Sequence, residues 1–507
     1  MSPDDLSLAL ANPLSALLDK PPGDFVRADF LDVIRKKGIE RIAFHYTALD
    51  GRLKEIKIPV TSLSQAELAL AEGERVDGSS VFKGIVDTEL SDLYVIPEYR
   101  TAFFNPFDDK SLGFICRLMT REGERASFAF DNVLTKAAQI FRESSGFDLF
   151  AAGELEFFLI FPKEKELFPV ERQMGYQESS PFIKSIMILD EMVRSIAKIS
   201  GAVKYSHSEV GYIDQIESEL EELQGKTAEQ LEVEFLSRPA EEMADFLVLA
   251  RWLIRNVAHR HGCMVTFAPK IEEGVAGNGL HFHLELRSNG RNIMLDSQRN
   301  LSEQARRLIG GVCTYADSLT AFGNTTASSY MRLIPNHEAP TRIFWSDLNR
   351  SALIRVPLGW ASVSGLADKI NPESQSEGFE SEPRQTVELR SADGSALIHL
   401  LLAGVAVSAK WAFEDNRSLE AAERYYVKDD KPGSSSALVD LPSLPASCTE
   451  SAEILEEKRR LYEMNGVFPA SLIDYVVELL QKEDVGIAGQ DRQQSIKSIM
   501  HRDLHRH

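Results

Sequence analysis

The pattern of apolar and polar positions divides the chain into two regions of different character. Residues 25–120 carry one helical pattern and four strand-like runs, two of which are separated by Asp50-Gly51, a dipeptide typical of hairpins. From residue 127 onward, longer helical patterns alternate with short strands. The first region is therefore predicted to be a small strand-rich domain, and the second an α/β or α+β domain.

The predicted elements follow from the spacing of the apolar residues. In the first region we expect a helix at 29–37 and strands at 41–46, 53–59, 93–96 and 113–119. In the second we expect helices at 129–143, 187–200, 240–261, 302–320, 450–464 and 470–482. The helix that follows Pro239 is predicted to end at Gly262.

The segments between these elements suggest domain boundaries. Residues 1–24 are predicted to be an N-terminal extension, 25–120 a first domain, 121–485 a second domain and 486–507 a polar, frayed C-terminal tail. The acidic segment 213–229 is interpreted as a surface insertion, with a solvated helix or loop as the simplest expectation.

Composition and charge narrow the class of protein. Lys and Arg number 56 against 77 Asp and Glu, which gives a net charge of −21 and makes binding to nucleic acid or to an anionic membrane unfavourable. The four cysteines form no CxxC pair and are expected to be reduced. The longest apolar stretch, 400–407, is too short to span a membrane, and the N-terminus is acidic. We therefore expect a soluble, cytoplasmic protein.

Three predicted strands carry charged residues at alternating positions. Glu154 and Glu156 share one face of 149–161, and His281 and His283 share one face of 279–286. Glu388 and Arg390 do the same in 386–390. For any one strand the simpler interpretation is a solvent-exposed face.

If these faces converge, their carboxylates need neutralisation. Two carboxylates about 4 Å apart repel by roughly 4 kcal/mol at an effective dielectric constant near 20. Glutamate oxygens with an occasional imidazole suit Mg²⁺ or Mn²⁺, so the pattern indicates a divalent-metal site.

Several arginines lie in mixed apolar segments, namely Arg332, Arg350, Arg355 and Arg390. Semi-buried arginine suits a bidentate grip on carboxylate or phosphate, although for any one arginine an ordinary salt bridge is the favoured interpretation in a chain with 21 surplus acids. Together with a metal site, these arginines suggest phosphoryl transfer. The chain has neither a Walker-type phosphate loop nor the glycine-rich loop of kinases.

Seven motifs in order carry a family resemblance. They are VDGSS at 76–80, GELEFF at 153–158, NVAHR at 256–260, GNGLHFH at 277–283, RLIPNHEAP at 332–340, NRSALIRVP at 349–357 and VELR at 387–390. With these motifs the chain resembles glutamine synthetase of the bacterial type from about residue 25 to about residue 485.

The resemblance implies an α+β fold and a shared active site. It implies an N-terminal β-grasp domain and a catalytic domain built on a curved antiparallel sheet, or partial barrel, with surrounding helices. It also implies a homo-oligomer of two stacked hexameric rings, with each site shared between neighbouring subunits. The implied substrates are ATP, glutamate and ammonium, and the implied cofactors are two or three Mg²⁺ or Mn²⁺ ions.

The resemblance also assigns expected roles to individual residues. The first metal site matches Glu156, Glu209 and Glu232, and the second matches Glu154, His281 and Glu388. The ammonium pocket matches Asp77 and Ser80 from a neighbouring subunit, with Tyr176 and Glu209. Glutamate is expected at Arg332, Arg355 and Gly277, phosphate at Arg350 and Arg390, and the nucleotide at His283. Glu338 matches the flap residue that closes over the intermediate.

Some positions depart from the family pattern and keep two alternatives open. Ala276 stands where asparagine is usual, the 213–229 segment separates two expected metal ligands, Glu285 replaces a small polar residue, and Leu397-Ile398-His399 replaces Asn-Pro-Tyr. One alternative is a γ-glutamyl ligase for a larger amine, such as a polyamine or ethanolamine. The retained Asp77, Ser80 and Tyr176 favour ammonium, because a bulky amine needs room there. The other alternative is a non-catalytic assembly or regulatory protein, against which the six retained metal ligands argue.

Overall fold

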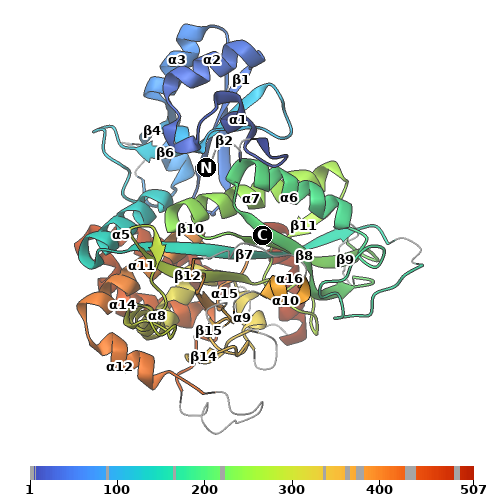
Figure 1. Ribbon diagram of the computed structural model, residues 1–507, viewed down its shortest axis with the longest axis vertical. Helices are drawn as coiled ribbons and strands as arrows, with labels where there is room; N and C mark the ends of the chain where they lie inside the picture. The colour runs from blue at the N-terminus through green and yellow to red at the C-terminus, as the bar shows by residue number, and fades with distance from the viewer. Residues whose placement is uncertain are drawn as a thin grey trace.

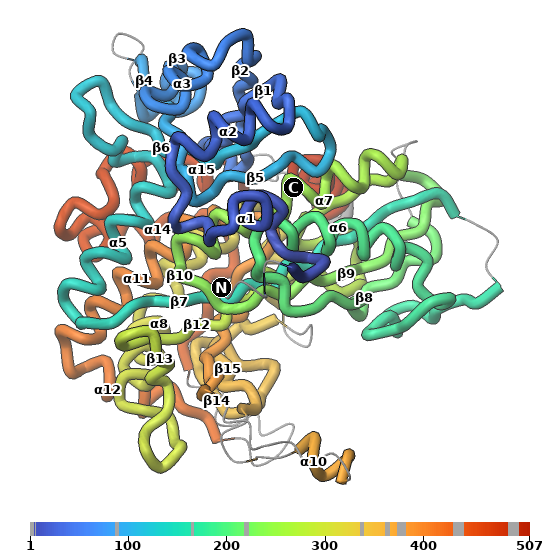
Figure 2. The backbone as a smooth tube through the Cα atoms, turned by 45° about the horizontal axis from the view of Figure 1, so that its top comes forward, coloured from blue at the N-terminus to red at the C-terminus, as the bar shows by residue number. Residues whose placement is uncertain are grey.

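The computed structural model describes residues 5, 7–86, 91–163, 167–216, 223–334, 339–359, 363, 366–372, 382–428, 441–484 and 492–507. The chain forms a small N-terminal domain, blue in Figure 1, that lies on a larger domain built around a long sheet. Figure 2 shows α10 (Leu366–Ile370) projecting from the larger domain at the end away from the small one.

The small domain is a mixed six-stranded sheet in the order β2-β1-β6-β4-β3, with β5 paired to β6. β1 runs antiparallel to β2 and parallel to β6, so the β1–β2 hairpin predicted around Asp50-Gly51 is present. The strands are β1 (Arg41–Thr47), β2 (Leu53–Pro59), β3 (Glu74–Asp77), β4 (Asp92–Pro97), β5 (Phe103–Phe104) and β6 (Ser111–Met119). The accompanying helices are α1 (Pro13–Leu18), α2 (Arg27–Lys37), α3 (Leu63–Glu72) and α4 (Gly78–Val81).

The large domain contains a ten-stranded sheet whose main path is β14-β15-β16-β12-β7-β9-β8. Apart from the parallel β14–β15 pair, its neighbours are antiparallel. The strands are β7 (Asp148–Phe161), β8 (Val203–Ile213), β9 (Thr227–Phe235), β10 (Arg238–Pro239), β11 (Met264–Thr266), β12 (Leu280–Ser288), β13 (Arg291–Asn292), β14 (Trp345–Asp347), β15 (Ile354–Val356) and β16 (Val387–Leu389).

Helices cover this sheet and build the apolar core. Helix α7 buries Leu247 against the sheet, where Gly153 of β7 leaves room: a Cβ at Gly153 would lie 2.8 Å from that leucine. Helix α11 is buried along most of its length between α5 and α8. The helices are α5 (Phe130–Ser145), α6 (Ile186–Ser200), α7 (Ala240–Arg260), α8 (Glu303–Gly323), α9 (Ser329–Arg332), α11 (Ile398–Glu414), α12 (Arg417–Arg424), α14 (Cys448–Glu463), α15 (Ala470–Asp484) and α16 (Arg492–Arg506).

Two sequence-based expectations about polar segments differ from the structure. The tail does not fray over 492–507, because α16 forms there and buries Ile499, Met500 and Leu504. Within the acidic segment 213–229, strand β9 already begins at Thr227, and Glu229 is buried. Residues 217–222 lie outside the described part of the chain. Both segments look hydrophilic because their few apolar residues are widely spaced in sequence and meet only in the fold.

No helix in the described ranges combines the length and apolar character that crossing a bilayer requires.

A buried histidine lies where the two domains meet. His45 of β1 is fully buried between Phe103 and Trp252 of α7, with ring centroids 5.5 and 5.3 Å from its own. Neither of its ring nitrogens has a hydrogen-bond partner, and its nearest carboxylate, Glu55, is 3.9 Å away. Burial lowers the pKa of His45 from 6.5 to about 4, against the smaller opposing effect of Glu55.

This histidine makes stability depend on pH with a defined sign. The unfolded chain binds a proton at His45 near pH 6.5 and the folded chain only near pH 4, so the stabilisation is complete above 6.5 and falls as the pH drops toward 4. A shift of this size corresponds to about 3 kcal/mol. The parent should lose this stability as the pH falls from 7 to 4, and His45→Phe should not. The free energy of unfolding of His45→Phe minus that of the parent, measured by thermal unfolding, should therefore increase by about 3 kcal/mol between pH 7 and pH 4. His261→Phe, at an exposed histidine, is the control, and parallel pH profiles for parent and His45→Phe would contradict the prediction.

Candidate active site

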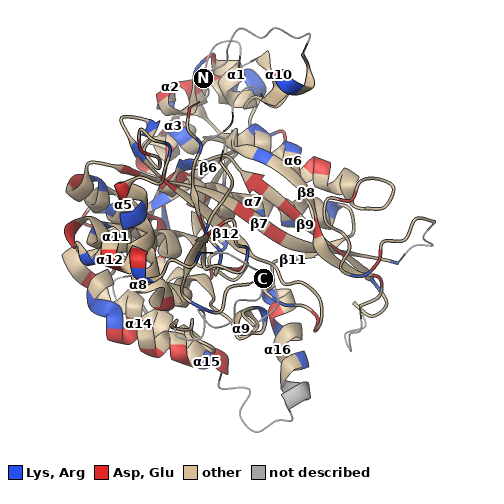
Figure 3. Ribbon diagram, turned by 60° about the horizontal axis from the view of Figure 1, so that its bottom comes forward, with Lys and Arg blue, Asp and Glu red and all other residues tan. Residues whose placement is uncertain are grey.

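One deep cavity of about 760 Å³ opens along the large sheet. Strands β7, β8, β9, β12 and β16 supply side chains to it, and Figure 3 shows acidic residues along β7, β8 and β9. The cavity is lined by all six predicted metal ligands, namely the five carboxylates and the imidazole: Glu154, Glu156, Glu209, Glu232, Glu388 and His281. The charged strand faces therefore converge rather than face solvent.

Antiparallel pairing brings together the compact group Glu154, His281 and Glu388. Glu154 lies opposite His281 in the β7–β12 register, and His283 lies opposite Glu388 in the β12–β16 register. Glu154 Oε2 is 3.0 Å from His281 Nδ1, and Glu154 Oε1 is 2.6 Å from His283 Nε2. One ligand atom each from Glu154, His281 and Glu388 lies within 4.8 Å of the others. These three are the residues expected to form one metal site.

The remaining predicted ligands, Glu156, Glu209 and Glu232, lie on β7, β8 and β9. Glu156 faces Glu232 across the β7–β9 pair. Gln230 Nε2 and the Gly279 amide donate to Glu156 Oε2 at 3.1 and 2.8 Å. These bonds fix the Glu156 carboxylate toward the glycine-rich entry to β12.

A second compact group contains His207, Glu232 and Glu234, whose ligand atoms also lie within 4.8 Å of one another. His207 Nε2 is 2.9 Å from Glu232 Oε2, and its Nδ1 is 3.8 Å from Glu209 Oε1. Lys204 Nζ is 2.8 Å from Glu234 Oε2. This group shares Glu232 with the predicted set of Glu156, Glu209 and Glu232 but brings in two residues that the sequence analysis did not select.

The electrostatics of the cavity fit a cluster of crowded acids. Burial together with the charges of Glu154, Glu156 and Glu209 raises the pKa of Glu232, although a bond from His207 opposes the shift. Burial disfavours charge at Glu154 as well, but the adjacent His283 and His281 hold the pKa of that carboxyl well below its usual range.

His207 carries a positive charge within this acidic group. Burial favours its neutral form, yet hydrogen bonds to Glu232 and Glu234 raise its pKa to about 11. The imidazolium therefore neutralises part of the acidic cluster near neutral pH.

Arginines form the other half of the cavity lining. Arg355 Nη1 is 2.8 Å from Glu388 Oε2, and Arg390 pairs with the other oxygen of the same carboxylate. Arg332 is buried and donates to the Ser391 carbonyl at 3.0 Å. Arg350 also lines the cavity from an exposed position. All four arginines selected from the sequence thus face one space.

Glycines permit the backbone to approach these groups. A Cβ at Gly277 would lie 2.3 Å from the Pro269 carbonyl oxygen, and a Cβ at Gly279 would lie 2.7 Å from His281 Nε2 and 2.9 Å from Arg332 Nη2. Larger residues would collide at both positions. Ala276, beside Gly277, lines the cavity without offering a polar side-chain atom.

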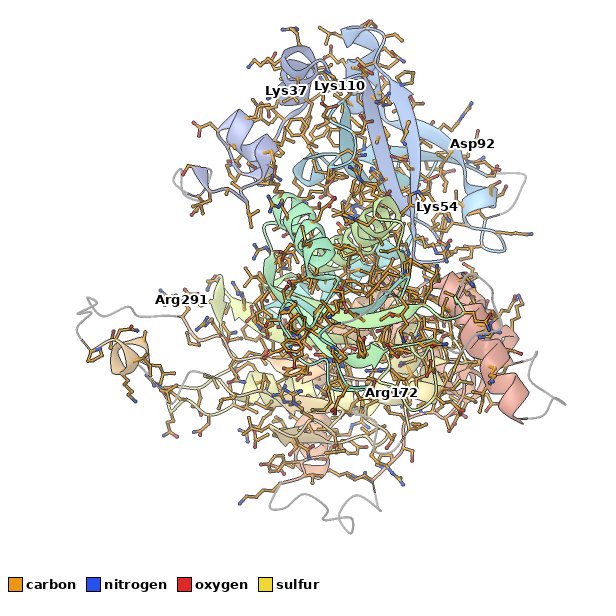
Figure 4. The ribbon with its side chains drawn as sticks, turned by 90° about the vertical axis from the view of Figure 1, so that its right-hand side faces the viewer. Lys37, Lys54, Asp92, Lys110, Arg172 and Arg291 are labelled. Atoms are coloured by element: carbon orange, nitrogen blue, oxygen red, sulfur yellow. The ribbon has the colours of Figure 1, made fainter. Side chains whose placement is uncertain are left out.

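The predicted ammonium residues lie in two places within one chain. Tyr176 lines the cavity, with its ring centroid 5.5 Å from that of His207. Asp77 and Ser80 do not line it; they lie on the small domain, with Ser80 Oγ donating to Asp77 Oδ2 at 2.6 Å. Figure 4 labels Asp92, the β4 partner of Asp77, on the small domain and Arg172 on the large one. The hydroxyls of Ser80 and Ser79 lower the pKa of Asp77.

The other sequence departures have defined surroundings. Glu285 is buried and accepts hydrogen bonds from Ser237 Oγ at 2.8 Å and Arg287 Nε at 2.7 Å, so its charge is compensated. His399, in the segment that departs from the family pattern, lies 3.1 Å from Asp245 at the domain interface, outside the cavity. Glu338 lies outside the described residues.

Sequence reasoning missed three residues that contact the predicted carboxylate ligands, namely His207, Gln230 and Glu234. The alternation of Gln230, Glu232 and Glu234 on β9 was a usable signal, because residues two apart share a strand face. His207 lies opposite Glu232 in the β8–β9 register, which includes a register shift near residue 204 that the sequence does not reveal.

The donor set fits a divalent cation. Carboxylate oxygens with one or two imidazole nitrogens are suitable ligands for Mg²⁺ or Mn²⁺, and the charges of the neighbouring acids favour a cation among them. Within the described residues, no cysteine lines the cavity, so the set lacks the thiolates of structural zinc sites.

Comparisons with known proteins agree with the resemblance read from the motifs. The family description "Glutamine synthetase, catalytic domain" matches residues 131–488, and "Glutamine synthetase, beta-Grasp domain" matches residues 38–121. The predicted fold class, an N-terminal β-grasp domain followed by this catalytic domain, is confirmed.

Individual relatives cover most of the chain at low identity. The chain is 33% identical over 391 residues to a glutamine synthetase of Halobacterium salinarum, covering 74% of this chain and 75% of the relative. It is 26% identical over 483 residues to that of Aquifex aeolicus, covering 90% and 94%. The solved Plasmodium falciparum glutamine synthetase superposes with a TM-score of 0.72 at 21% identity, covering 93% of this chain and 98% of the other, which shows a shared fold.

Proposed function

Because the chain belongs to the glutamine synthetase family, a family of ligases, we propose that it joins ammonia to the γ-carboxylate of glutamate at the expense of ATP. The observation that carries the proposal is the convergence of six metal-ligand candidates and four arginines on one cavity. The carboxylates can hold divalent ions, and the arginines can hold carboxylate and phosphate groups. This combination suits phosphoryl transfer to a carboxylic acid.

Two sets of side chains would hold the metal ions. They are Glu154, His281 and Glu388, and Glu156, Glu209 and Glu232. Bound Mg²⁺ or Mn²⁺ supplies Lewis-acid polarisation of the γ-phosphate of ATP. His283, held by Glu154 and by Thr386 Oγ1 at 2.9 Å, is assigned to the nucleotide.

The arginines and the glycine-rich segment orient the reactants. Arg332, Arg355 and the backbone at Gly277 hold glutamate, and Arg350 and Arg390 neutralise the phosphate oxygens. An oxygen of the γ-carboxylate attacks the terminal phosphorus, ADP leaves, and γ-glutamyl phosphate forms. The closing role that the resemblance implies for Glu338 is assigned to it, because an acyl phosphate hydrolyses in open water. Asp77 takes a proton from ammonium, and ammonia displaces phosphate from the acyl carbon.

The position of Asp77 supports a site completed by a second subunit. Its carboxylate is exposed on the small domain and lies outside the cavity of its own chain. We therefore propose a homo-oligomer, of two stacked hexameric rings as in the implied assembly, in which Asp77 and Ser80 serve a neighbour's cavity.

A panel of amines tests the function. The purified protein is supplied with ATP, glutamate and Mg²⁺ or Mn²⁺, and ADP release is measured with ammonium, methylamine, ethanolamine and putrescine. Ammonium should give the highest kcat/KM. Activity confined to a larger amine would overturn this choice and favour the alternative, a γ-glutamyl ligase for a larger amine. The observation that favours this alternative is that Ala276 lines the cavity without a polar side chain.

Replacing Asp77 by alanine should abolish ammonium use without affecting the fold. The loss of a proton acceptor is expected to reduce kcat about 10²- to 10⁴-fold. The thermal unfolding midpoint should fall only slightly, because the carboxylate is exposed and its bond from the Ser79 amide caps only the short helix α4. Asp92→Ala, on the paired strand, is the matched control. Near-parental turnover of Asp77→Ala would remove this residue from its role.

A further inference from the structure

The C-terminal helix α16 ends inside the large domain rather than on its periphery. Figure 1 places the C-terminus beside α16 and β11, and Thr266 Oγ1 at the end of β11 donates to the Leu504 carbonyl at 2.9 Å. Arg255 Nη2 of α7 donates to the His507 carbonyl at 2.6 Å. Arg502 Nη2 is 2.6 Å from Glu483 Oε2 of α15. Three separate elements thus hold the last six residues in place.

Two residues of this segment contact elements that carry cavity-lining residues. Asp503, which is fully buried, accepts the Ser328 amide at Oδ2 over 3.3 Å, while its Oδ1 pairs with Arg502 Nε at 3.0 Å. Ser328 immediately precedes α9, the single turn that ends at the cavity residue Arg332. Asp503 therefore fixes the start of the turn that aims Arg332.

Leu504 packs against the loop that leads to Gly277, next to Arg332. It is 3% exposed and belongs to a small apolar cluster with Ala268, Ile271 and Val275, separate from the main core. Val275 is followed by Ala276 and Gly277, and all three line the cavity. The loop between β11 and β12 therefore rests on the C-terminal segment.

We propose that Asp503 and Leu504 are positioning residues for the amino-acid end of the cavity. Neither lines the cavity, so they act through Arg332 and through the backbone at Gly277. The inference rests on the proposed function, because it assigns those two groups to glutamate. At the proposed ATP end, His283 bonds to Glu154 and Thr386 Oγ1, neither of which belongs to α16.

Steady-state kinetics separates positioning from a general structural role. Asp503→Ala should raise the KM for glutamate about tenfold, the effect of losing one buried hydrogen bond, while the KM for ATP stays within about twofold. Lys497→Ala, an exposed position on the same helix, is the matched control and should change neither. An unchanged glutamate KM, or equal rises in both KM values, would overturn the proposal. If the alanine variant fails to fold, Asp503→Asn provides the same test, because it keeps the side-chain volume but loses the charge. It should raise the KM for glutamate about threefold.

Hydrogen–deuterium exchange provides a readout that requires no substrate. Peptides covering 264–277 and 326–334 should exchange faster in Asp503→Ala than in the parent or in Lys497→Ala. Unchanged exchange in both peptides would overturn the positioning role even if the enzyme is active. If Asp503→Ala exchanges faster but the parent shows no glutamate-dependent ADP release, the structural role of Asp503 stands and the proposed function is refuted.

Discussion

Replacing Glu154 by glutamine is expected to reduce ATP-dependent ligation about a thousandfold. The carboxylate of Glu154 lies in the compact group with His281 and Glu388 and also contacts His283, so its loss should affect both the proposed metal site and the proposed nucleotide side. The charge removed is one that a divalent cation requires, and losses of this size are typical when transition-state charge stabilisation is removed. The side-chain volume is retained, so the packing around β7 should survive.

Two measurements distinguish this effect from misfolding. Calorimetric titration with Mn²⁺ should show weaker binding by Glu154→Gln. The thermal unfolding midpoint without metal should fall only modestly, because glutamine keeps the side-chain volume but loses the charge that His281 and His283 stabilise. Glu143→Gln on α5, an exposed glutamate outside the cavity, is the control. Parental ADP release by Glu154→Gln would exclude Glu154 from the metal site.

Replacing Arg117 by methionine should destabilise the protein by about 3–5 kcal/mol, because it leaves buried acids without their partner. Arg117 of β6 lies where the small domain meets the large one: its Nη1 is 3.1 Å from Asp131 and 3.0 Å from Asp245, and its Nε is 2.7 Å from Glu98. Burial disfavours charge at Asp245, yet Arg117 and His399 hold its pKa below the usual range. Methionine fills similar volume but compensates none of these charges.

Thermal and denaturant unfolding measure this loss. Arg121→Met, at an exposed arginine two positions beyond the end of the same strand, should change stability by less than about 0.5 kcal/mol. Adding Asp245→Asn to Arg117→Met should recover part of the loss, because the buried charge is then removed. A marginal effect of Arg117→Met would show that the interface draws its stability from apolar packing alone.

Much of the site was predictable because side chains two positions apart on a strand share a face, which appears in the sequence as alternation. The alternation of Glu154 with Glu156, and of His281 with His283, places each pair on one strand face. Which strands neighbour one another was not predictable, because register depends on contacts between distant segments. Strand β12 lies between β7 and β16, and this order brings Glu154, His281 and Glu388 within 4.8 Å of one another.

Buried polar groups were the main source of error. His207 and Glu234 appear as ordinary polar residues in sequence, and only the β8–β9 pairing brings them into the acidic group with Glu232. The C-terminal segment was expected to fray because its apolar residues are sparse. Leu504 nevertheless fills a small pocket formed by residues of β7, β9 and the β11–β12 loop.

The family, the fold class, most helices and strands, and the residue types of the proposed metal site were readable from the amino-acid sequence, because local periodicity and motif spacing are properties of neighbouring positions. The three-dimensional fold was needed to show which carboxylates group together, where His207 and Arg332 point, and that the C-terminal segment contacts Ser328 and the Val275 cluster. Those features arise from strand order, register and burial, which depend on interactions between residues far apart along the chain.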